Sequence, residues 1–202
     1  MAFAKSNRKP RIDREERAGG ILDASIRCVM RHGFHGTTIA DIAAEAGISV
    51  GIIYRYYKNK EAIIEAIVAR GVSEVESRLE EVKFLQGHDL ADHMLAAVPE
   101  IVASNAERER SGLRLEIFAE AARNPRVEDI VRRYGAVQRE QLRGILVRTL
   151  NKQTSIEELD ERLEMLIVIF DGLLSHDLRS PSTSREPLIR SMQATLKSIL
   201  LN

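Results

Sequence analysis

Apolar residues recur at helical spacing along nearly the whole chain, and no stretch alternates apolar and polar residues for long enough to predict a strand. Between Asp13 and His32 they follow the i, i+3, i+4, i+7 pattern of an amphipathic helix, which Gly33 is expected to end. A longer apolar stripe predicts a helix from Glu61 to about Phe84. Five more helices are expected beyond it, with breaks near residues 86–88, 105–111, 124–125, 151–155 and 180–186. The pattern therefore predicts an all-α protein of about nine helices.

Two short helices joined by a glycine turn are predicted between Thr37 and Tyr57. Thr38 is an N-cap residue, and Asp41 three positions later is expected to complete a capping box. Gly47 ends this helix, and Ser49 is expected to cap the next one. The inward residues are Ile39, Ile42, Ala43 and Ala46 on the first helix and Ile48, Ile52 and Ile53 around the second. Such a pair predicts a helix-turn-helix, which together with the preceding helix forms a three-helix module.

The second helix of this motif enters the major groove of DNA, so its outward residues are the candidate contacts. They are Ser49, Val50, Gly51, Tyr54 and Arg55, with Tyr56 at the end of the helix and Lys58 and Lys60 beyond it. Phenols and ammonium groups suit phosphates, whereas Arg55 has the geometry for a bidentate contact with guanine. The structural alternative is a plain helical hairpin inside a bundle.

Charge is divided unevenly along the 202 residues, although the 30 Lys and Arg balance the 30 Asp and Glu. Residues 1–60 hold eleven basic and six acidic side chains, and residues 61–202 hold nineteen and twenty-four. This division predicts a basic flexible arm at 1–12, a DNA-binding domain at 13–60 and a helical domain at 61–202. A single cysteine excludes an intrachain disulfide, and the absence of a long apolar run predicts a cytoplasmic protein without a membrane partner.

The residues from Thr37 to Ile64 resemble the signature of the TetR family of bacterial transcriptional regulators (TetR/AcrR type). The likeness lies in Thr-Thr-Ile-Ala-Asp-Ile-Ala, Ala-Gly-Ile-Ser-x-Gly, Ile-Tyr-x-Tyr-Tyr and Lys-x-Lys-Glu-Ala-Ile. It implies backbone contact with DNA by Thr38 and phosphate contact by Tyr56 and Lys60. It also implies base or phosphate contacts by Ser49, Val50, Gly51, Tyr54 and Arg55. The family often has a long polar or cationic residue, or proline, in place of Val50, which shifts base readout toward Arg55 and the arm.

The same resemblance implies a cavity for a small-molecule effector among the central helices of the second domain. Tyr134 and Gln138 lie one turn apart and are expected to present two polar tips to one space. The full candidate set is Phe84, His93, Met94, Val98, Phe118, Tyr134, Gln138, Met165 and Ile169. The alternative for each of these residues is a surface or ordinary core position.

The last two predicted helices, 156–178 and 185–201, carry more apolar surface than one face needs, which favours burial about a twofold axis. The resemblance implies a four-helix interface of a homodimer there. The candidate interface residues are Leu166, Phe170, Asp171, Leu174, Met192, Leu196 and Ile199. The alternative is that both helices are central to the core of one chain. For Asp171 an interface or packing role is favoured over ligand binding, and His176 fits either the interface or a pocket.

An enzyme is not expected, because the five histidines lack the spacing of a metal site and no phosphate loop or nucleophile motif is present. No metal and no cofactor are expected. The resemblance implies instead a repressor that binds a palindromic operator in double-stranded DNA and is released by an effector. The alternative is a helical interaction protein of the same fold that does not read DNA specifically.

Overall fold

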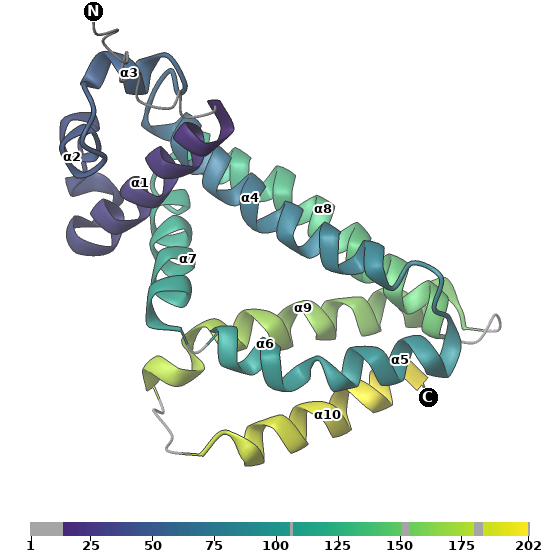
Figure 1. Ribbon diagram of the computed structural model, residues 1–202. Coiled ribbons are helices and arrows are strands. Elements are labelled where there is room, and N and C mark those ends of the chain that lie inside the picture. Colours follow the sequence, from purple (N-terminus) through teal and green to yellow (C-terminus); the bar gives the residue numbers. More distant parts are fainter. Residues whose placement is uncertain (1–13, 106, 151–153, 180–183, 202) are drawn as a thin grey trace, which may run out of the picture. The chain divides into compact units, whose positions relative to one another are not determined.

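The computed structural model describes residues 14–105, 107–150, 154–179 and 184–201 (Figure 1). Within these ranges the chain forms ten helices and no strand, which confirms the all-α prediction. The predicted arm, residues 1–12, lies outside the described residues. No helix in the described part is long and apolar enough to cross a membrane. The chain divides into two compact units between Ile63 and Ile64.

The first unit contains α1 (Arg14–Gly36), α2 (Ile39–Glu45) and α3 (Val50–Tyr54). α2 packs against both α1 and α3. The core consists of side chains from all three helices, with Ile21, Cys28, Ile42 and Ile53 each at most 1% exposed. Cys28 is therefore a packed thiol, as its place on the apolar stripe predicts.

Gly33 interrupts α1, with a φ of 70° and a ψ of 165° that place it outside helical geometry. This positive φ favours glycine because a Cβ would clash with the backbone there. The regular helix ends before Gly33 as predicted, and a further turn continues to Gly36. The change of direction at Gly33 brings Phe34 into the core, where it is 4% exposed.

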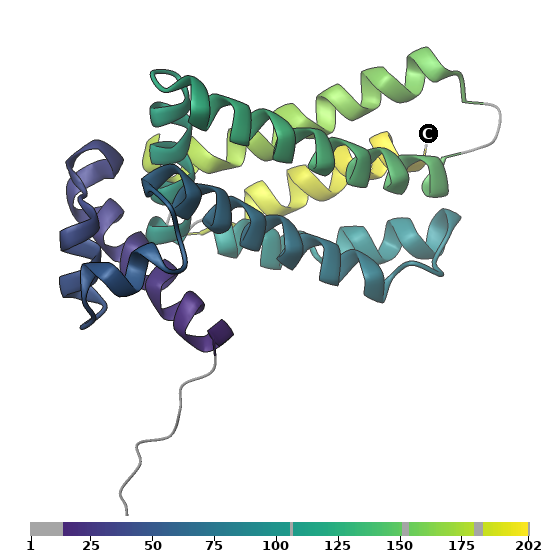
Figure 2. The same ribbon diagram turned by 90° about the horizontal axis from the view of Figure 1, so that it is seen from above.

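The second unit contains most of α4 (Lys60–Glu81), followed by α5 (Gly87–Ala96), α6 (Val98–Asn105), α7 (Arg108–Ala121), α8 (Pro125–Thr149), α9 (Ile156–Arg179) and α10 (Glu186–Leu201). α9 contacts α8, and Figure 1 shows α5 and α6 following one another along α10. Figure 2 shows the same helices from above. The buried core is built mainly from α5, α6, α8, α9 and α10, and includes Leu90, Val98, Leu146, Leu163 and Leu196.

The segment predicted as one helix between residues 88 and 105 forms two, α5 and α6, which accounts for ten helices where about nine were expected. Pro99 explains the break because its ring nitrogen has no hydrogen to donate to the carbonyl of Leu95, four residues earlier. The Gln193 amide of α10 donates to that Leu95 oxygen at 3.1 Å. A side chain from a distant helix therefore satisfies the carbonyl that the proline leaves without its regular partner.

Helix ends in the second unit follow the capping chemistry of the sequence. The Asn124 side chain accepts from the Arg126 amide at 3.1 Å, with Pro125 in the first turn of α8. The Ser155 hydroxyl accepts from the Glu158 amide at 3.1 Å and so caps α9. Just beyond the C-terminal end of α4, the carbonyls of Val82 and Lys83 accept hydrogen bonds from the Arg148 guanidinium, both at 3.1 Å.

The inward face of α9 differs from the predicted one. Leu166 is 2% exposed and belongs to the core of its own chain, whereas its neighbour Met165 is 52% exposed. The run from Met165 to Phe170 is apolar all round, so its periodicity cannot show which side faces inward, and neighbouring positions point about 100° apart. Met165 was predicted in a pocket and Leu166 at an interface, and the structure gives both residues other surroundings.

Two residues of α10 need the same correction. Met192 and Leu196, also predicted at the interface, are 5% and 4% exposed and pack in the core of the single chain. Phe170 and Ile199 are partly buried against this core, and the side chain of Leu174 lies outside the described part. The alternative that both helices are central to the core of one chain therefore holds for these two leucines and for Met192.

Candidate DNA-binding surface

The N-terminus of α2 is fixed by a reciprocal capping box between Thr38 and Asp41. The Asp41 amide donates to the Thr38 hydroxyl oxygen at 3.1 Å, and the Thr38 amide donates to the Asp41 carboxylate at 2.8 Å. The Thr38 hydroxyl also donates to this carboxylate at 2.7 Å. The hydrogen bonds from the Thr38 hydroxyl and, after it, from the Thr38 amide hold the pKa of Asp41 below its ordinary value of 3.8. The Asp41 carboxylate is therefore ionised near neutral pH.

The turn between α2 and α3 depends on Gly47, which has a φ of 63°. A residue with a Cβ would be strained there. Ser49 occupies the N-cap position of α3, and its backbone oxygen accepts from the Ile52 amide at 2.9 Å. Its hydroxyl makes no capping bond, contrary to the expectation that it caps the helix, so the hydroxyl is left for another partner.

The outward side of α3 has the composition predicted for a DNA contact surface. Ser49, Val50, Gly51, Tyr54 and Arg55 are all exposed, with Tyr54 at 54%, while Ile53 on the inward side is fully buried. A Cβ built on Gly51 meets no atom within 4 Å, so the backbone of α3 is open to close approach at this position. We call Ser49, Val50, Gly51, Tyr54 and Arg55 the α3 surface. Tyr56 is half-buried, at the end of the same segment.

The ammonium group of Lys60 bonds to backbone carbonyls of its own chain, whereas a phosphate contact was predicted for it. Its ammonium donates to the backbone oxygens of Phe34 at 2.7 Å and Thr37 at 2.9 Å, and it lies 3.5 Å from that of His35. It also lies over the Phe34 ring, 4.4 Å from the centroid. An ammonium group has three protons, and these carbonyls engage them. In this structure Lys60 therefore ties the start of α4 to the turn between α1 and α2.

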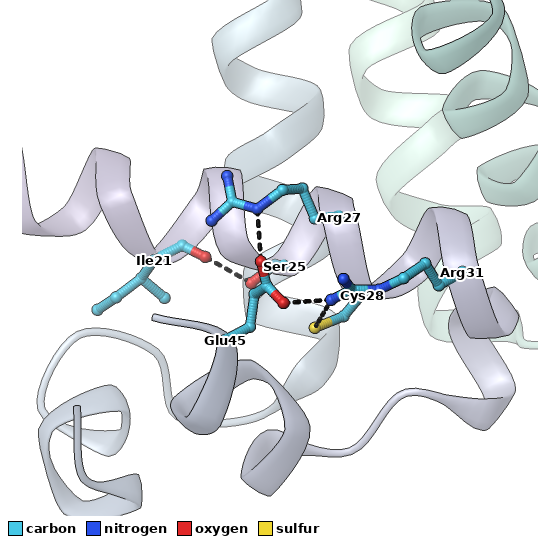
Figure 3. A network of polar contacts seen from close by, with 6 residues as sticks. All are labelled: Ile21, Ser25, Arg27, Cys28, Arg31 and Glu45. Carbon is cyan, nitrogen blue, oxygen red and sulfur yellow. Dashed lines mark hydrogen bonds and ion pairs between the residues drawn. The ribbon is translucent and has the colours of Figure 1, made fainter. Parts of the chain in front are cut away.

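A network that the sequence reasoning missed fastens α2 to α1 (Figure 3). The Glu45 carboxylate, at the end of α2, accepts from the Arg27 Nε at 2.7 Å and also pairs with Arg31. The Arg31 guanidinium reaches the Cys28 sulfur at 3.9 Å. Hydrogen bonds from Arg27 and then Arg31 hold the pKa of Glu45 below its ordinary value of 4.5. The i, i+4 spacing of the two arginines was the available signal, but their partner lies in another helix.

The candidate effector residues do not converge on one cavity. Val98 is fully buried in the core, and Phe84, Phe118 and Met165 are 85%, 40% and 52% exposed. His93 and Gln138 are exposed, whereas Met94, Tyr134 and Ile169 are partly buried. A shallow, solvent-open depression of about 520 Å³ lies on the surface against α4 and α8. Its lining residues are Glu76, Ala136, Val137, Glu140 and Gln141, none of which was predicted.

Asp171 is exposed on α9 and interacts electrostatically with Arg114 of α7. Burial lowers the pKa of the Arg114 guanidinium, and attraction from Asp171 opposes that shift. His176 is half-buried on the same helix as Asp171. Within the described residues no group of three or more His, Cys, Asp or Glu side chains is arranged to hold a metal ion.

Two family models match the chain. The model of bacterial regulatory proteins of the tetR family covers residues 21–67, and that of the tetracyclin repressor-like C-terminal domain covers residues 86–200. The HTH-type transcriptional regulator UidR of Escherichia coli strain K12 is 30% identical over 107 residues. That stretch is 53% of this chain and 53% of UidR, so the chain spans about half the length of this curated relative.

Solved structures share the fold at low sequence identity. The regulator FadR of Bacillus subtilis, in complex with stearoyl-CoA, superposes with a TM-score of 0.69 at 19% identity, covering 91% of this chain and 97% of that one. A transcriptional regulator of Saccharomonospora viridis in complex with choline gives 0.69 at 20% identity, covering 92% and 97%. An acyl-CoA and a small quaternary ammonium ion differ in charge and size, so this fold does not by itself determine the ligand.

Proposed function

Because the chain belongs to the TetR family of bacterial regulatory proteins, we propose that it is a DNA-binding transcriptional regulator that acts as a repressor. The observation that carries the proposal is the α3 surface. Its polar and aromatic side chains face outward on a helix whose inner residue, Ile53, is fully buried. A surface presented in this way enters a major groove without disturbing the core beneath it.

Within this proposal the residues divide by the contacts they make. Tyr54 and the hydroxyl of Ser49 hydrogen-bond to phosphates, and the open backbone at Gly51 approaches the groove closely. Arg55 is exposed and reads a guanine with its guanidinium. Thr38, at the start of α2, contacts the DNA backbone. Lys60 supports this surface from behind by holding the turn that leads into α2.

We also propose that the protein works as a homodimer on a palindromic operator. Met165 and Val168 are 52% and 63% exposed, and Gly172 continues the same side of α9 at helical spacing. An apolar stripe with a small residue lets two copies of the helix pack closely about a twofold axis. This stripe replaces the buried Leu166, Met192 and Leu196 as the proposed centre of the interface.

The regulatory step in this proposal is a population shift. A small-molecule effector binds the second unit more tightly in the conformation that fits the operator poorly, so operator affinity falls by that difference. The chain does no catalysis in this account, and it works in the cytoplasm, where the chromosome is accessible.

The test is selection of genomic fragments by the purified protein, followed by titration of a selected duplex and a random duplex of equal length. A sequence-reading regulator binds the selected duplex at least about a thousandfold more tightly at physiological salt. Equal affinity for both duplexes would reject specific reading and favour the alternative, an interaction protein of the same fold.

A further inference from the structure

Val50 contributes an aliphatic side chain to the α3 surface, at the end of the helix that faces the bases. α3 begins at Val50, whose side chain is 37% exposed. In a helix-turn-helix the N-terminal residues of the second helix lie next to base edges. Tyr54, four positions later, lies on the same side of α3 one turn away. Val50 therefore lies against a base and Tyr54 nearer the phosphates, a placement that rests on the proposed function.

The backbone beside Val50 allows the helix to come close to the bases. Gly51 has no side chain, and a Cβ built there meets no atom within 4 Å. A valine side chain is short, so it reaches a base only where the backbone that carries it approaches closely. Ile53, which is fully buried, anchors α3 to the first unit from the opposite side. The methyl groups of Val50 are thus free to contact a base edge directly.

The chemistry of the valine side chain decides which base it favours, because its methyl groups neither donate nor accept hydrogen bonds. In the major groove guanine, adenine and cytosine present hydrogen-bonding atoms, whereas thymine presents a C5-methyl group beside one acceptor. Valine against a polar base edge displaces water without replacing the hydrogen bond of that water, which is unfavourable. Valine against the thymine methyl buries apolar surface on both sides, which is favourable. The contact therefore attracts thymine and disfavours the other three bases.

We propose that Val50 reads the C5-methyl group of one thymine in each half of the operator. The group that it recognises is the methyl itself and not the base pair that carries it. Uracil keeps every hydrogen-bonding atom of thymine and is nevertheless a poorer partner, and 5-methylcytosine is a better partner than cytosine. Arg55 keeps helical backbone angles one turn after Gly51, so Val50 and the guanine-reading Arg55 specify different positions of the half-site.

The experiment is an anisotropy titration of the full chain with a duplex selected from genomic DNA. Each thymine of one half-site is replaced in turn by deoxyuridine, which removes the methyl group and leaves base pairing intact. We expect one position at which the wild-type chain loses affinity about fourfold, the contribution of one buried methyl group. At that position a C·G pair should bind more weakly than T·A, and methylating its cytosine at C5 should recover about fourfold.

Two variants assign this loss to Val50. Val50→Ala removes the contact, so the same deoxyuridine substitution should then cost less than about twofold. Val75→Ala is the matched control, at a valine of similar exposure, 38%, on α4, and it should keep the fourfold loss. Both valines are exposed, and thermal melting should show that each variant stays folded. Changing the base and the side chain together separates the contact from any effect of deoxyuridine on DNA shape.

The possible failures of Val50 and of the proposed function give different results. A fourfold loss that persists in Val50→Ala, or the absence of any thymine at which the wild type loses affinity, would overturn the reading by Val50. The preference for the selected duplex over a random one would then still support the proposed function. Equal affinity of the wild type for both duplexes would reject the proposed function and the reading by Val50 with it.

Discussion

Replacing Lys60 by methionine separates two roles for a cation at the start of α4. Methionine keeps most of the apolar stem and removes the ammonium. The ammonium makes two short hydrogen bonds, at 2.7 and 2.9 Å, to the carbonyls of Phe34 and Thr37. Hydrogen bonds that involve a charged group contribute roughly 1.5–3 kcal/mol each, part of which water recovers here because Lys60 is only partly buried. We expect Lys60→Met to lower the free energy of unfolding of the first unit by about 2–4 kcal/mol.

Two measurements on the same variant test this role. Hydrogen exchange of α1 and α2 amides reports the stability of the first unit by itself. The salt dependence of DNA affinity counts phosphate contacts, because each lost contact reduces the slope of log affinity against log salt by about 0.9. If Lys60 holds the turn, exchange accelerates in α1 and α2, and the salt slope of the remaining binding is unchanged.

Lys58 provides the matched control, since it lies two residues away, is exposed and makes no contact within the described residues. Lys58→Met should remove one phosphate contact from each DNA-binding unit, which reduces the salt slope by about 0.9 per unit, and it should leave hydrogen exchange unchanged. The reverse result, with unchanged exchange and a reduced salt slope for Lys60→Met, would refute the holding role and restore the phosphate contact.

Three further predictions test other parts of the account. Gly51→Ala should raise the free energy of unfolding by up to about 1 kcal/mol in thermal melting and weaken DNA binding in anisotropy titrations. Gly71, another exposed helical glycine with open space around it, is the control, and Gly71→Ala should raise stability without changing DNA binding. Glu45→Gln should lower the melting temperature near neutral pH. Its pKa is depressed in the folded state, so the wild-type advantage is present above the ordinary value of 4.5 and disappears as pH falls through the folded-state pKa; a gap that persists in strong acid would contradict this. Val168→Asp should convert a dimer to a monomer in sedimentation experiments, and Val147→Asp, at a valine of similar exposure on α8, should not.

Local chemistry allowed the sequence to predict the first unit well. The Thr38 and Asp41 pair, the turn at Gly47 and the break at Gly33 depend on residues within a few positions of each other, and the structure confirms all three. The inward position of Ile53 follows from helical periodicity alone. Features of this kind need no knowledge of distant packing.

Contacts between distant segments were the part that the sequence could not predict. The ammonium of Lys60 bonds to carbonyls more than twenty positions earlier, and Glu45 pairs with arginines of another helix. In α9 an apolar run that continues around the helix left the inward face undetermined. Leu166, expected at an interface, lies in the core, and Met165, expected in a pocket, is exposed. Pro99 was a local signal for the break between α5 and α6 that the periodicity analysis did not use.

The candidate effector residues were the hardest to place from the sequence, because their surroundings depend on how distant helices pack. The sequence pointed to Tyr134 and Gln138 as neighbours on one helix. In the structure Tyr134 is partly buried and Gln138 is exposed. The exposure of each side chain is decided by every helix that packs near it, and periodicity along one helix does not contain that information.

Reading of DNA by the α3 surface is the central claim, and one measurement tests it most directly. The affinity for a duplex selected from genomic DNA is compared with that for a random duplex at physiological salt, for the wild-type chain and for Arg55→Ala. The account predicts that the wild type prefers the selected duplex by at least about a thousandfold. It predicts that Arg55→Ala loses about 1–3 kcal/mol of this preference at one base pair of each half-site. An unchanged preference in the variant, or none in the wild type, would contradict the claim.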